Sequence, residues 1–338
     1  MKTTSLPLVL LTHTLPEDWL ASLKGYVRAV VGPLDATCLA PELEARLAEA
    51  EGLFCLLTIL VRKELLDRMP RLRVVSNMAV GVDNVDVAAC TARGIPVGNT
   101  PGVLTDATAD LTMSLLLAAA RRLPEASRDA REGCWKTWSP AGWLGADLRG
   151  ATLGIVGLGK IGRAVAERAR GFGLRIVYTD TSPRQDVEAE LGATFLSFDE
   201  LIRQSDFISL HCPLTPETRG LINESALRRM NPTAILVNAA RGPVVDTVAL
   251  TRALAEGRIA AAALDVTDPE PLPSDHPLYS LSNCLIVPHI GSATRGTRRR
   301  MAEMACENLL AGLEGRRLPY CVNPEVYEKP VFSKKKGF

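Results

Sequence analysis

Three side chains with complementary chemistry follow short apolar segments in the last third of the chain. They are Arg241 in NAARG, Glu270 in DVTDPEP and His289 in VPHIGSA, and 48 residues separate the first from the last. An imidazole delivers protons near neutral pH, and a neighbouring carboxylate favours its charged form and fixes its orientation. A guanidinium grips a carboxylate through forked donors. Alone, each residue has an ordinary explanation as a structural histidine, a turn-capping arginine or a solvated loop glutamate; together they predict an acid–base site.

A glycine-rich turn lies upstream of these residues. An apolar segment runs into Gly157, Gly159 and Gly162, with Lys160 and Ile161 between them, and a helical pattern follows. The first glycine permits a tight turn, the second lets the backbone approach a pyrophosphate, and the third lets the helix pack closely on its strand. The helix also directs unpaired N–H groups at the anion. A turn without a ligand is the alternative, but the order of strand, glycines, helix and acid favours dinucleotide binding.

Asp180 bears on which dinucleotide is bound. It comes 18 residues after Gly162, at the end of the next apolar segment. A carboxylate there accepts hydrogen bonds from a free ribose 2′-hydroxyl and repels a 2′-phosphate, so NAD(H) is favoured. Asp180 lies one position beyond the commonest place for this acid, and Arg184 nearby is either a solvated arginine or a ligand for a phosphate. NADP(H) therefore stays open.

The two features combine into one reaction. A hydride that reaches a carbonyl carbon from a dihydronicotinamide leaves negative charge on the oxygen, and His289 is suited to deliver a proton there. Glu270 would orient the imidazole, while Arg241 would hold the carboxylate of a 2-keto acid and polarise its carbonyl. Ligands of open α/β sheets bind beyond the carboxyl ends of the strands, where these three residues are expected to converge. We therefore predict an NAD(P)-dependent oxidoreductase acting on a small 2-keto or 2-hydroxy acid.

Two series of short apolar segments alternate with amphipathic stretches, which is typical of βαβ units on parallel sheets. This pattern predicts an α/β fold with two open parallel-sheet domains. The first series of expected strands is Leu8–Leu11, Val27–Val31, Leu53–Thr58, Val74–Ser76 and Ile95–Val97. The second series is Leu153–Val156, Leu174–Tyr178, Phe207–His211, Ala234–Asn238, Ala260–Asp265 and Cys284–Val287.

Two long helices set the domain organisation. The segment Thr105–Arg121 is apolar around most of its circumference, which predicts a buried helix that joins the domains. Helix start and stop signals in Ala293–Gly315 predict a helix that returns the chain to the first sheet after Pro288. The expected divisions are a discontinuous substrate domain at 1–104 and 289–325, a nucleotide-binding domain at 105–288, and a tail at 326–338.

The connecting segment 124–150 carries unusual apolar area. Trp135, Trp138 and Trp143 fall within nine residues of it. Apolar area of this kind on a connection generally packs against a partner, and symmetric dimers are the commonest oligomers. We expect a homodimer with this arm in its contact; an arm folded back on its own chain is the alternative.

Composition excludes several other classes. The 338 residues are 47% hydrophobic, enough for two cores, and a net charge of +1 provides no general attraction to nucleic acid or an anionic membrane. Eight cysteines lack C-x-x-C or Cys/His ligand spacing, which predicts reduced thiols with neither disulfide nor metal. The N-terminus lacks the apolar core and cleavage site of an export signal, and no segment has the apolar length of a membrane span. A cytoplasmic location is expected.

Five segments resemble the D-isomer-specific 2-hydroxyacid dehydrogenase family, and the resemblance extends over nearly the whole chain. They are GLGKIG, HCPLTPETRGLIN, LVNAARGPVVD, LDVTDPEPLPSDHPL and PHIGSAT. The sequences VGVD at 80–83 and TPGVLTDATAD at 100–110 are most similar to the glyoxylate/hydroxypyruvate reductase branch. The resemblance implies a flavodoxin-like substrate domain, a Rossmann-type nucleotide domain, a dimer, and Arg241, Glu270 and His289 as the catalytic triad.

The resemblance also implies binding roles. The backbone at Val80 and Gly81 would hold the substrate carboxylate, as an anion-binding nest does. Ser292 would touch the substrate or position the histidine. Trp143 resembles an aromatic residue that reaches the active site of a neighbouring subunit, although the spacing here is shifted by one residue.

On the cofactor side, Thr105 would lie against the nicotinamide, and the Ala239 carbonyl and Asp265 would bind its carboxamide. The residues 211–213 would line the adenine. The complete predicted set is Thr105, Gly157, Gly159, Lys160, Ile161, Gly162, Asp180, His211, Cys212, Pro213, Thr218, Ala239, Ala240, Asp265 and Gly291.

The substrate predicted from this resemblance is glyoxylate or hydroxypyruvate, reduced to glycolate or D-glycerate. The phosphite-oxidising branch carries a lysine where this chain has Val80, and without that ammonium a doubly charged oxyanion loses its counter-charge. Larger 2-keto acids, 2-ketogluconate among them, stay open because pocket size depends on tertiary structure. The C-terminal-binding corepressors share this fold, NAD and the triad but serve as protein scaffolds; consumption of NADH with these substrates separates the two classes.

Overall fold

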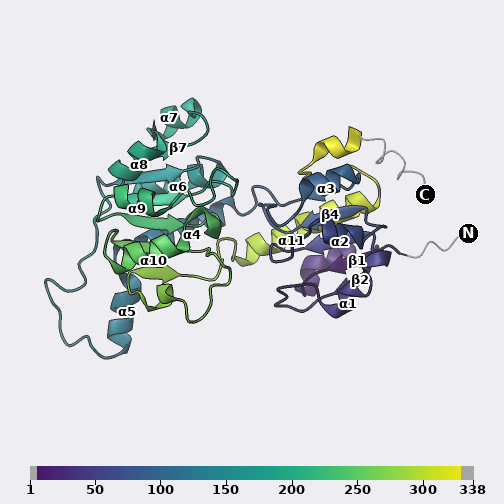
Figure 1. The fold of residues 1–338 in the computed structure, drawn as a ribbon, viewed down its shortest axis with the longest axis horizontal. Coiled ribbons are helices and arrows are strands. Elements are labelled where there is room, and N and C mark those ends of the chain that lie inside the picture. The colour runs from purple at the N-terminus through teal and green to yellow at the C-terminus, as the bar shows by residue number, and fades with distance from the viewer. Residues whose placement is uncertain (1–5, 329–338) are drawn as a thin grey trace, which may run out of the picture. The chain divides into compact units, whose positions relative to one another are not determined.

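The protein is described by a computed structural model covering residues 6–328. Two compact units make up the chain (Figure 1). The first unit holds the chain up to Leu104 and from Thr294 onward, and the second runs from Thr105 to Ala293. Each unit is built on its own parallel sheet.

The first unit contains a five-stranded parallel sheet in the order β2-β1-β3-β4-β5, which is the flavodoxin-like order. Its strands are β1 (Leu8–Leu11), β2 (Arg28–Val31), β3 (Gly52–Cys55), β4 (Val74–Asn77) and β5 (Val97–Gly98). β3 ends three residues before the predicted Thr58, because the Thr58 hydroxyl donates to the Ala36 carbonyl at 3.2 Å and holds this stretch in a loop. Alternate strand residues enter two separate apolar clusters, so both faces of the sheet are covered.

The helices of the first unit include one long element from the far end of the chain. They are η1 (Glu17–Leu23), α1 (Pro41–Glu44), η2 (Leu47–Glu49), α2 (Lys63–Asp67), α3 (Val87–Ala92), α11 (Arg295–Leu313) and η5 (Pro324–Glu328). α11 packs on β3, β4 and β5, and the Ser76 hydroxyl donates to the Ala305 carbonyl at 2.7 Å. This packing returns the end of the chain to the first sheet.

The chain stays packed beyond the point where a tail was predicted to begin. Val326 is fully buried in η5, and the Leu318 N–H donates to the Tyr327 hydroxyl at 2.8 Å. The predicted start of the tail at 326 is therefore wrong by at least three residues. The rest of the expected tail, 329–338, lies outside the described residues.

The second unit contains a seven-stranded parallel sheet in the order β12-β11-β10-β9-β6-β7-β8. Counted from β6, this is the Rossmann order with one further strand at the edge. The strands are β6 (Thr152–Val156), β7 (Arg175–Thr179), β8 (Thr194–Phe195), β9 (Phe207–Leu210), β10 (Ile235–Asn238), β11 (Ala261–Leu264) and β12 (Cys284–Ile286). β8 was not predicted, since two residues are too short to show an alternating pattern.

Helices cover both faces of this second sheet. They are α4 (Thr105–Ala120), α5 (Leu123–Arg131), α6 (Lys160–Gly171), α7 (Gln185–Leu191), α8 (Phe198–Gln204), α9 (Glu224–Arg229), η3 (Gly242–Val244), α10 (Thr247–Ala255) and η4 (Pro277–Ser280). Ile208 and Leu236 face the cluster under α8, α9 and α10, while the adjacent Phe207 and Ile235 face the cluster under α4, α6 and α7. α4 packs against α6, β10 and β11, so this apolar helix is buried on several sides as predicted.

The second unit ends at Ala293, later than the predicted boundary before 289. The reason is local hydrogen bonding: the Ile290 and Gly291 N–H groups donate to the Asp265 carboxylate at 2.6 and 2.9 Å. These bonds hold residues 289–291 against β11.

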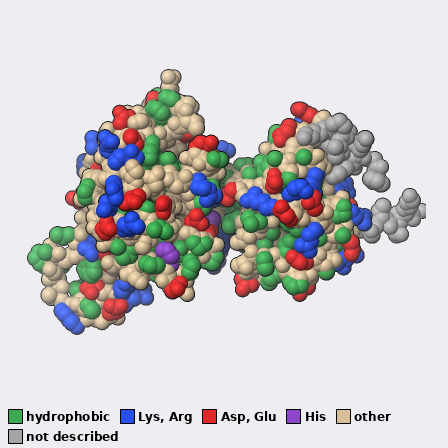
Figure 2. All heavy atoms as spheres, viewed as in Figure 1, with side chains coloured by type: hydrophobic (Ala, Val, Ile, Leu, Met, Phe, Trp, Pro, Cys, Tyr) green, Lys and Arg blue, Asp and Glu red, His purple; other side chains and the backbone are tan. Residues whose placement is uncertain are grey.

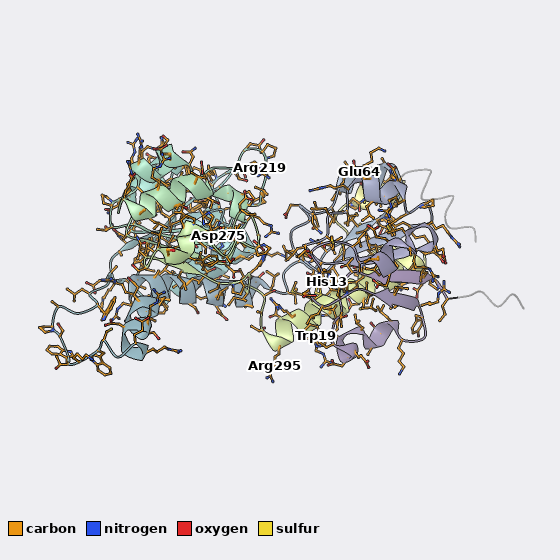
Figure 3. All side chains as sticks on the ribbon, turned by 60° about the horizontal axis from the view of Figure 1, so that its bottom comes forward. His13, Trp19, Glu64, Arg219, Asp275 and Arg295 are labelled. Atoms are coloured by element: carbon orange, nitrogen blue, oxygen red, sulfur yellow. The ribbon has the colours of Figure 1, made fainter. Side chains whose placement is uncertain are left out.

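The segment after α5 projects from the body of the second unit (Figure 1). Trp135 and Trp138 are 70% and 79% exposed, and hydrophobic side chains are visible on this projection in Figure 2. Its side chains spread outward in Figure 3. Trp143 differs: its indole N–H donates to Asp129 at 3.2 Å, and the Arg122 guanidinium lies 4.9 Å from its ring centre. Its own chain thus holds Trp143, while the other two tryptophans remain open to a partner.

Lys, Arg, Asp and Glu side chains are interspersed on the visible face of both units (Figure 2). No helix within residues 6–328 is both long and apolar enough to cross a lipid bilayer. In the same part of the chain, no group of three or more His, Cys, Asp or Glu side chains is arranged to hold a metal ion.

Candidate active site

The predicted triad lies beyond three adjacent strands of the second sheet. β10, β11 and β12 are neighbours, and their register pairs Asn238 with Leu264 and Leu264 with Ile286. The strands therefore end level with one another. Arg241, Glu270 and His289 follow them at the same edge, where open α/β sheets bind ligands.

His289 and Glu270 form an acid–base pair. The imidazole Nδ1 lies 2.5 Å from Glu270 Oε1, and the two side chains are 28% and 34% exposed. Since Nδ1 contacts the carboxylate, proton exchange with a substrate falls to Nε2. The pair is partly open to ligands, as a proton donor must be.

The backbone of His289 adopts a left-handed conformation, with φ at 50°. Few residues other than glycine occupy this region, and surrounding structure must hold them there. The His289 N–H donates to the Asp265 carbonyl at 2.9 Å. This hydrogen bond to the residue after β11 therefore holds the backbone of His289 and fixes the direction of its side chain.

Asp265 is the buried carboxylate that organises this turn. It is 2% exposed, and its two oxygens accept the N–H groups of Ile290 and Gly291. Burial raises the pKa of Asp265, and the hydrogen bond from Ile290 opposes that rise. The Gly291 carbonyl accepts from the Thr108 hydroxyl of α4 at 3.2 Å. The predicted contact of Asp265 with a carboxamide stays a prediction.

A second buried side chain holds the turn that carries Arg241. The Asn238 amide donates to the Arg241 carbonyl at 2.9 Å, and its oxygen accepts the Ala240 N–H at 3.0 Å. A Cβ on the next residue, Gly242, would overlap the carbonyl of Thr267. The Arg241 turn thus packs directly on the segment that leads to Glu270. Asn238 was not predicted, although an amide at the end of the apolar segment AILVN is a usable signal.

The glycine loop combines a tight turn with one open position. Gly157 has φ at 93°, and a Cβ there would lie 2.7 Å from the Cys212 nitrogen. A Cβ on Gly162 would overlap the Gly157 carbonyl, whereas one on Gly159 would meet nothing within 4 Å. The loop packs tightly against the segment after β9 at Gly157 and against α6 at Gly162, and it is open at Gly159, where α6 begins with Lys160 and the partly exposed Ile161. These features fit a dinucleotide pyrophosphate.

Asp180 is connected to this loop. Its Oδ2 accepts the Leu158 N–H at 2.8 Å, and its Oδ1 accepts the Thr181 N–H at 2.7 Å. The carboxylate therefore lies beside the glycine turn, where the acid of a dinucleotide fingerprint is needed.

The predicted adenine side follows β9. His211 Nε2 lies 2.8 Å from the Ser209 hydroxyl, while its buried Nδ1 meets no hydrogen-bond partner among the described residues. Burial lowers the pKa of His211 to about 4, so this imidazole is neutral at physiological pH and unsuited to donate a proton. Cys212 is buried, and the Thr218 hydroxyl donates to the Pro213 carbonyl at 2.6 Å, closing the loop that continues to Arg219 (Figure 3).

Three asparagines hold the predicted carboxylate-binding turn in the first unit. The Asn77 amide donates to the Gly81 carbonyl at 3.0 Å and to Asn84 at 3.1 Å, and the Asn99 amide donates to the Val80 carbonyl at 2.8 Å. Both carbonyl oxygens therefore already accept hydrogen bonds from protein side chains. The sequence prediction missed these asparagines. Asn77 ends the apolar segment VVSN as Asn238 ends AILVN, so the same pattern could have indicated it.

The remaining predicted residues occupy the same segments of the second unit. Thr105 is the first residue of α4, Ala239 lies between β10 and Arg241, and Ser292 follows the turn held by Asp265. All three are partly exposed. Their contacts with a cofactor or substrate stay predictions.

The sheet order, the glycine loop and the acid–base pair together define a nucleotide-dependent oxidoreductase. The profile described as "D-isomer specific 2-hydroxyacid dehydrogenase, NAD binding domain" matches residues 113–291. The chain belongs to the D-isomer-specific 2-hydroxyacid dehydrogenase family, and it is an NAD(P)-dependent enzyme.

Relatives cover nearly the whole chain. A glyoxylate reductase of Thermococcus kodakarensis is 49% identical over 332 residues, which cover 96% of this chain and 99% of that protein. A human glyoxylate reductase/hydroxypyruvate reductase is 50% identical over 282 residues, covering 83% and 86%. Among solved structures, an NADPH-dependent glyoxylate/hydroxypyruvate reductase from Sinorhizobium meliloti, in complex with NADP and malonate, is 33% identical with a TM-score of 0.81, covering 94% and 97%.

Replacing Glu270 by glutamine tests the acid–base pair. The amide cannot stabilise a charged imidazole, so we expect kcat/KM for reduction of a 2-keto acid to fall about 100-fold, with little change in melting temperature. The matched control is Asp268→Asn, which removes a carboxylate two residues away. Equal losses in both variants would contradict a specific role for Glu270.

Replacing Gly242 by alanine tests the packing between the two catalytic turns. Because the new Cβ overlaps Thr267, we expect the free energy of unfolding to fall by about 1–3 kcal/mol. We also expect kcat/KM to fall about 100-fold through misplacement of Arg241 and Glu270. Denaturant unfolding and initial rates measure the two effects. Gly171→Ala in α6, whose Cβ would meet nothing within 4 Å, should preserve both quantities.

Proposed function

We propose that this protein reduces glyoxylate and hydroxypyruvate to glycolate and D-glycerate. The observation that carries the proposal is the 2.5 Å contact between His289 and Glu270, at the ligand-binding edge of a sheet that also bears the glycine loop. Relatives named for these two activities are about half identical to the chain.

The nicotinamide nucleotide, when bound, supplies the hydride. His289 donates a proton from Nε2 to the carbonyl oxygen as negative charge develops there. Glu270 stabilises the imidazolium before the transfer and keeps the ring oriented. Arg241 binds the substrate carboxylate and stabilises charge on the oxygen through its planar donors.

The first unit is proposed to be the substrate domain. Its turn at Val80 and Gly81 would hold the substrate carboxylate with backbone N–H groups, since the asparagines already occupy the two carbonyls. Ser292 would contact the substrate or His289. The open space at Gly159 and the unpartnered nitrogen of His211 support the proposed binding of the cofactor by the second unit.

NAD(H) is the proposed preferred cofactor. Asp180 lies at the glycine loop with its charge available to ribose hydroxyls, and a 2′-phosphate there would meet like charge. The S. meliloti relative is named as NADPH-dependent, so this preference needs a direct measurement in this chain.

A cytoplasmic homodimer is the proposed state of the protein. Its eight cysteines are free thiols, which suits a reducing compartment. The exposed Trp135 and Trp138 provide the contact surface for a second copy. The indole of Trp143, hydrogen-bonded to Asp129, would fix the base of the arm. Trp143 would also be the aromatic residue that reaches the active site of the neighbouring subunit.

An initial-rate panel tests the proposed substrates. Glyoxylate, hydroxypyruvate, pyruvate and 2-ketogluconate are compared with NADH and with NADPH, and the first two should give the highest kcat/KM with NADH. Oxidation of neither NADH nor NADPH by glyoxylate or hydroxypyruvate would refute the proposed substrates.

Substitution of the proton donor tests the mechanism. His289→Ala should lower kcat/KM for glyoxylate by about 10²–10⁴-fold, because the alkoxide would have to take its proton from water. Arg241→Lys keeps the positive charge but loses the paired N–H donors that bind a carboxylate at two points, so KM should rise more than kcat falls. His276→Asn, a change elsewhere in the same unit, serves as the control. Near-normal rates in His289→Ala would exclude this assignment.

Removal of the exposed tryptophans tests the dimer. In the double variant Trp135→Ser/Trp138→Ser, each lost anchor should cost about 2 kcal/mol, raising the dimer dissociation constant about 30-fold per residue. Sedimentation equilibrium measures this constant. Val248→Ser removes a side chain that is 69% exposed on α10 and should leave it unchanged. A wild-type monomer, or an unaltered constant in the double variant, would argue against the arm as a dimer contact.

A further inference from the structure

The turn between β7 and α7, residues 180–184, is anchored by a buried tyrosine. The Tyr178 side chain is fully buried, its hydroxyl accepts the Arg184 N–H at 2.6 Å, and it donates to Glu188 of α7 at 2.8 Å. These bonds fix the Arg184 backbone relative to β7. The position of this arginine is thus built into the fold.

The Arg184 side chain reaches the same residue of the glycine loop that Asp180 contacts. Its Nη1 donates to the Leu158 carbonyl at 3.4 Å, while Asp180 Oδ2 accepts the Leu158 N–H at 2.8 Å. Asp180 is the carboxylate proposed to receive the ribose hydroxyls. The guanidinium and the carboxylate proposed to bind the ribose therefore meet at the same residue, Leu158.

A carboxylate already occupies the forked donors of this guanidinium. Arg184 Nε donates to Asp186 Oδ1 at 3.3 Å, and Arg184 Nη2 donates to Asp186 Oδ2 at 3.4 Å. This two-point contact has the geometry by which arginine binds a phosphate. The hydrogen bond from Arg184 lowers the pKa of the Asp186 carboxyl, so the pair stays ionised at neutral pH.

We infer that Asp186 is a specificity-determining residue that discriminates against adenosine 2′-phosphate by occupying Arg184. A 2′-phosphate must displace the Asp186 carboxylate before it can bind the Arg184 guanidinium, whereas binding of a 2′-hydroxyl does not require this arginine. Asp186 thus acts at a different point from Asp180, whose charge repels the phosphate directly. The inference rests on the proposed preference for NAD(H).

The size of the effect follows from the exposure of the pair. The Arg184 and Asp186 side chains are 41% and 58% exposed, and ion pairs in water are weak. Release of the arginine should therefore improve NADP⁺ binding about two- to fivefold. Asp180 remains in place, so a complete reversal of preference is not expected from this one change.

The test is Asp186→Asn in the full-length protein, with dissociation constants for NAD⁺ and NADP⁺ measured by calorimetric titration. The NADP⁺ constant should fall about two- to fivefold, and the NAD⁺ constant should stay unchanged. In Arg184→Ala/Asp186→Asn the gain should vanish, because the released guanidinium is what binds the phosphate.

Glu190→Gln is the matched control. Glu190 lies on the same helix and pairs with Arg163 at 2.6 Å, so its loss removes one negative charge without touching Arg184. An equal gain in NADP⁺ affinity from Glu190→Gln would overturn the inference in favour of a general charge effect.

Two further outcomes separate this inference from the proposed function. An unchanged NADP⁺ constant in Asp186→Asn, in a protein that still binds NAD⁺ and reduces glyoxylate, would overturn the role of Asp186 alone. A wild-type protein that binds neither dinucleotide would overturn the cofactor proposal, and the inference with it.

Discussion

The buried carboxylate of Asp265 is the constraint on which the active site depends. Its two oxygens accept consecutive backbone N–H groups of Ile290 and Gly291, and its own carbonyl accepts that of His289. These bonds hold His289 in a left-handed backbone conformation, which residues other than glycine rarely adopt. Burial raises the pKa of Asp265, the hydrogen bond from Ile290 opposes that rise, and the same turn carries His289, the proposed proton donor. Glu270 completes the arrangement by orienting the ring.

The same device recurs at the ends of other strands. Asn238 bonds both sides of the Arg241 turn, and Asn77 and Asn99 hold the carbonyls of Gly81 and Val80. Asn238 and Asn77 end their strands and bond backbone groups of the turns that follow, whereas Asn99, after β5, reaches the turn that follows β4. A buried amide without partners would cost free energy, so each one selects a single turn conformation. The functional residues occupy turns, while these buried residues determine the shape of the turns.

Most of the fold was predictable because its signals are local. All six expected strands in the second series begin and end within one residue of the observed strands, and the glycine loop lies where its sequence placed it. The errors have physical causes. β8 is too short to show periodicity, the Asp265 hydrogen bonds extend the second unit beyond 289, and the burial of Val326 extends the packed chain beyond the expected start of the tail.

By itself the sequence determined the two parallel sheets, the glycine turn and the set of residues at the strand ends, because periodicity, turn chemistry and the carboxyl-end rule act over short spans of chain. Tertiary structure alone decided which groups hold those residues. The bonds between Asp265 and the turn after β12 and between Arg184 and Leu158 join positions separated by other elements. Such partners become neighbours only when the chain has folded, since distance along the sequence carries no information about them.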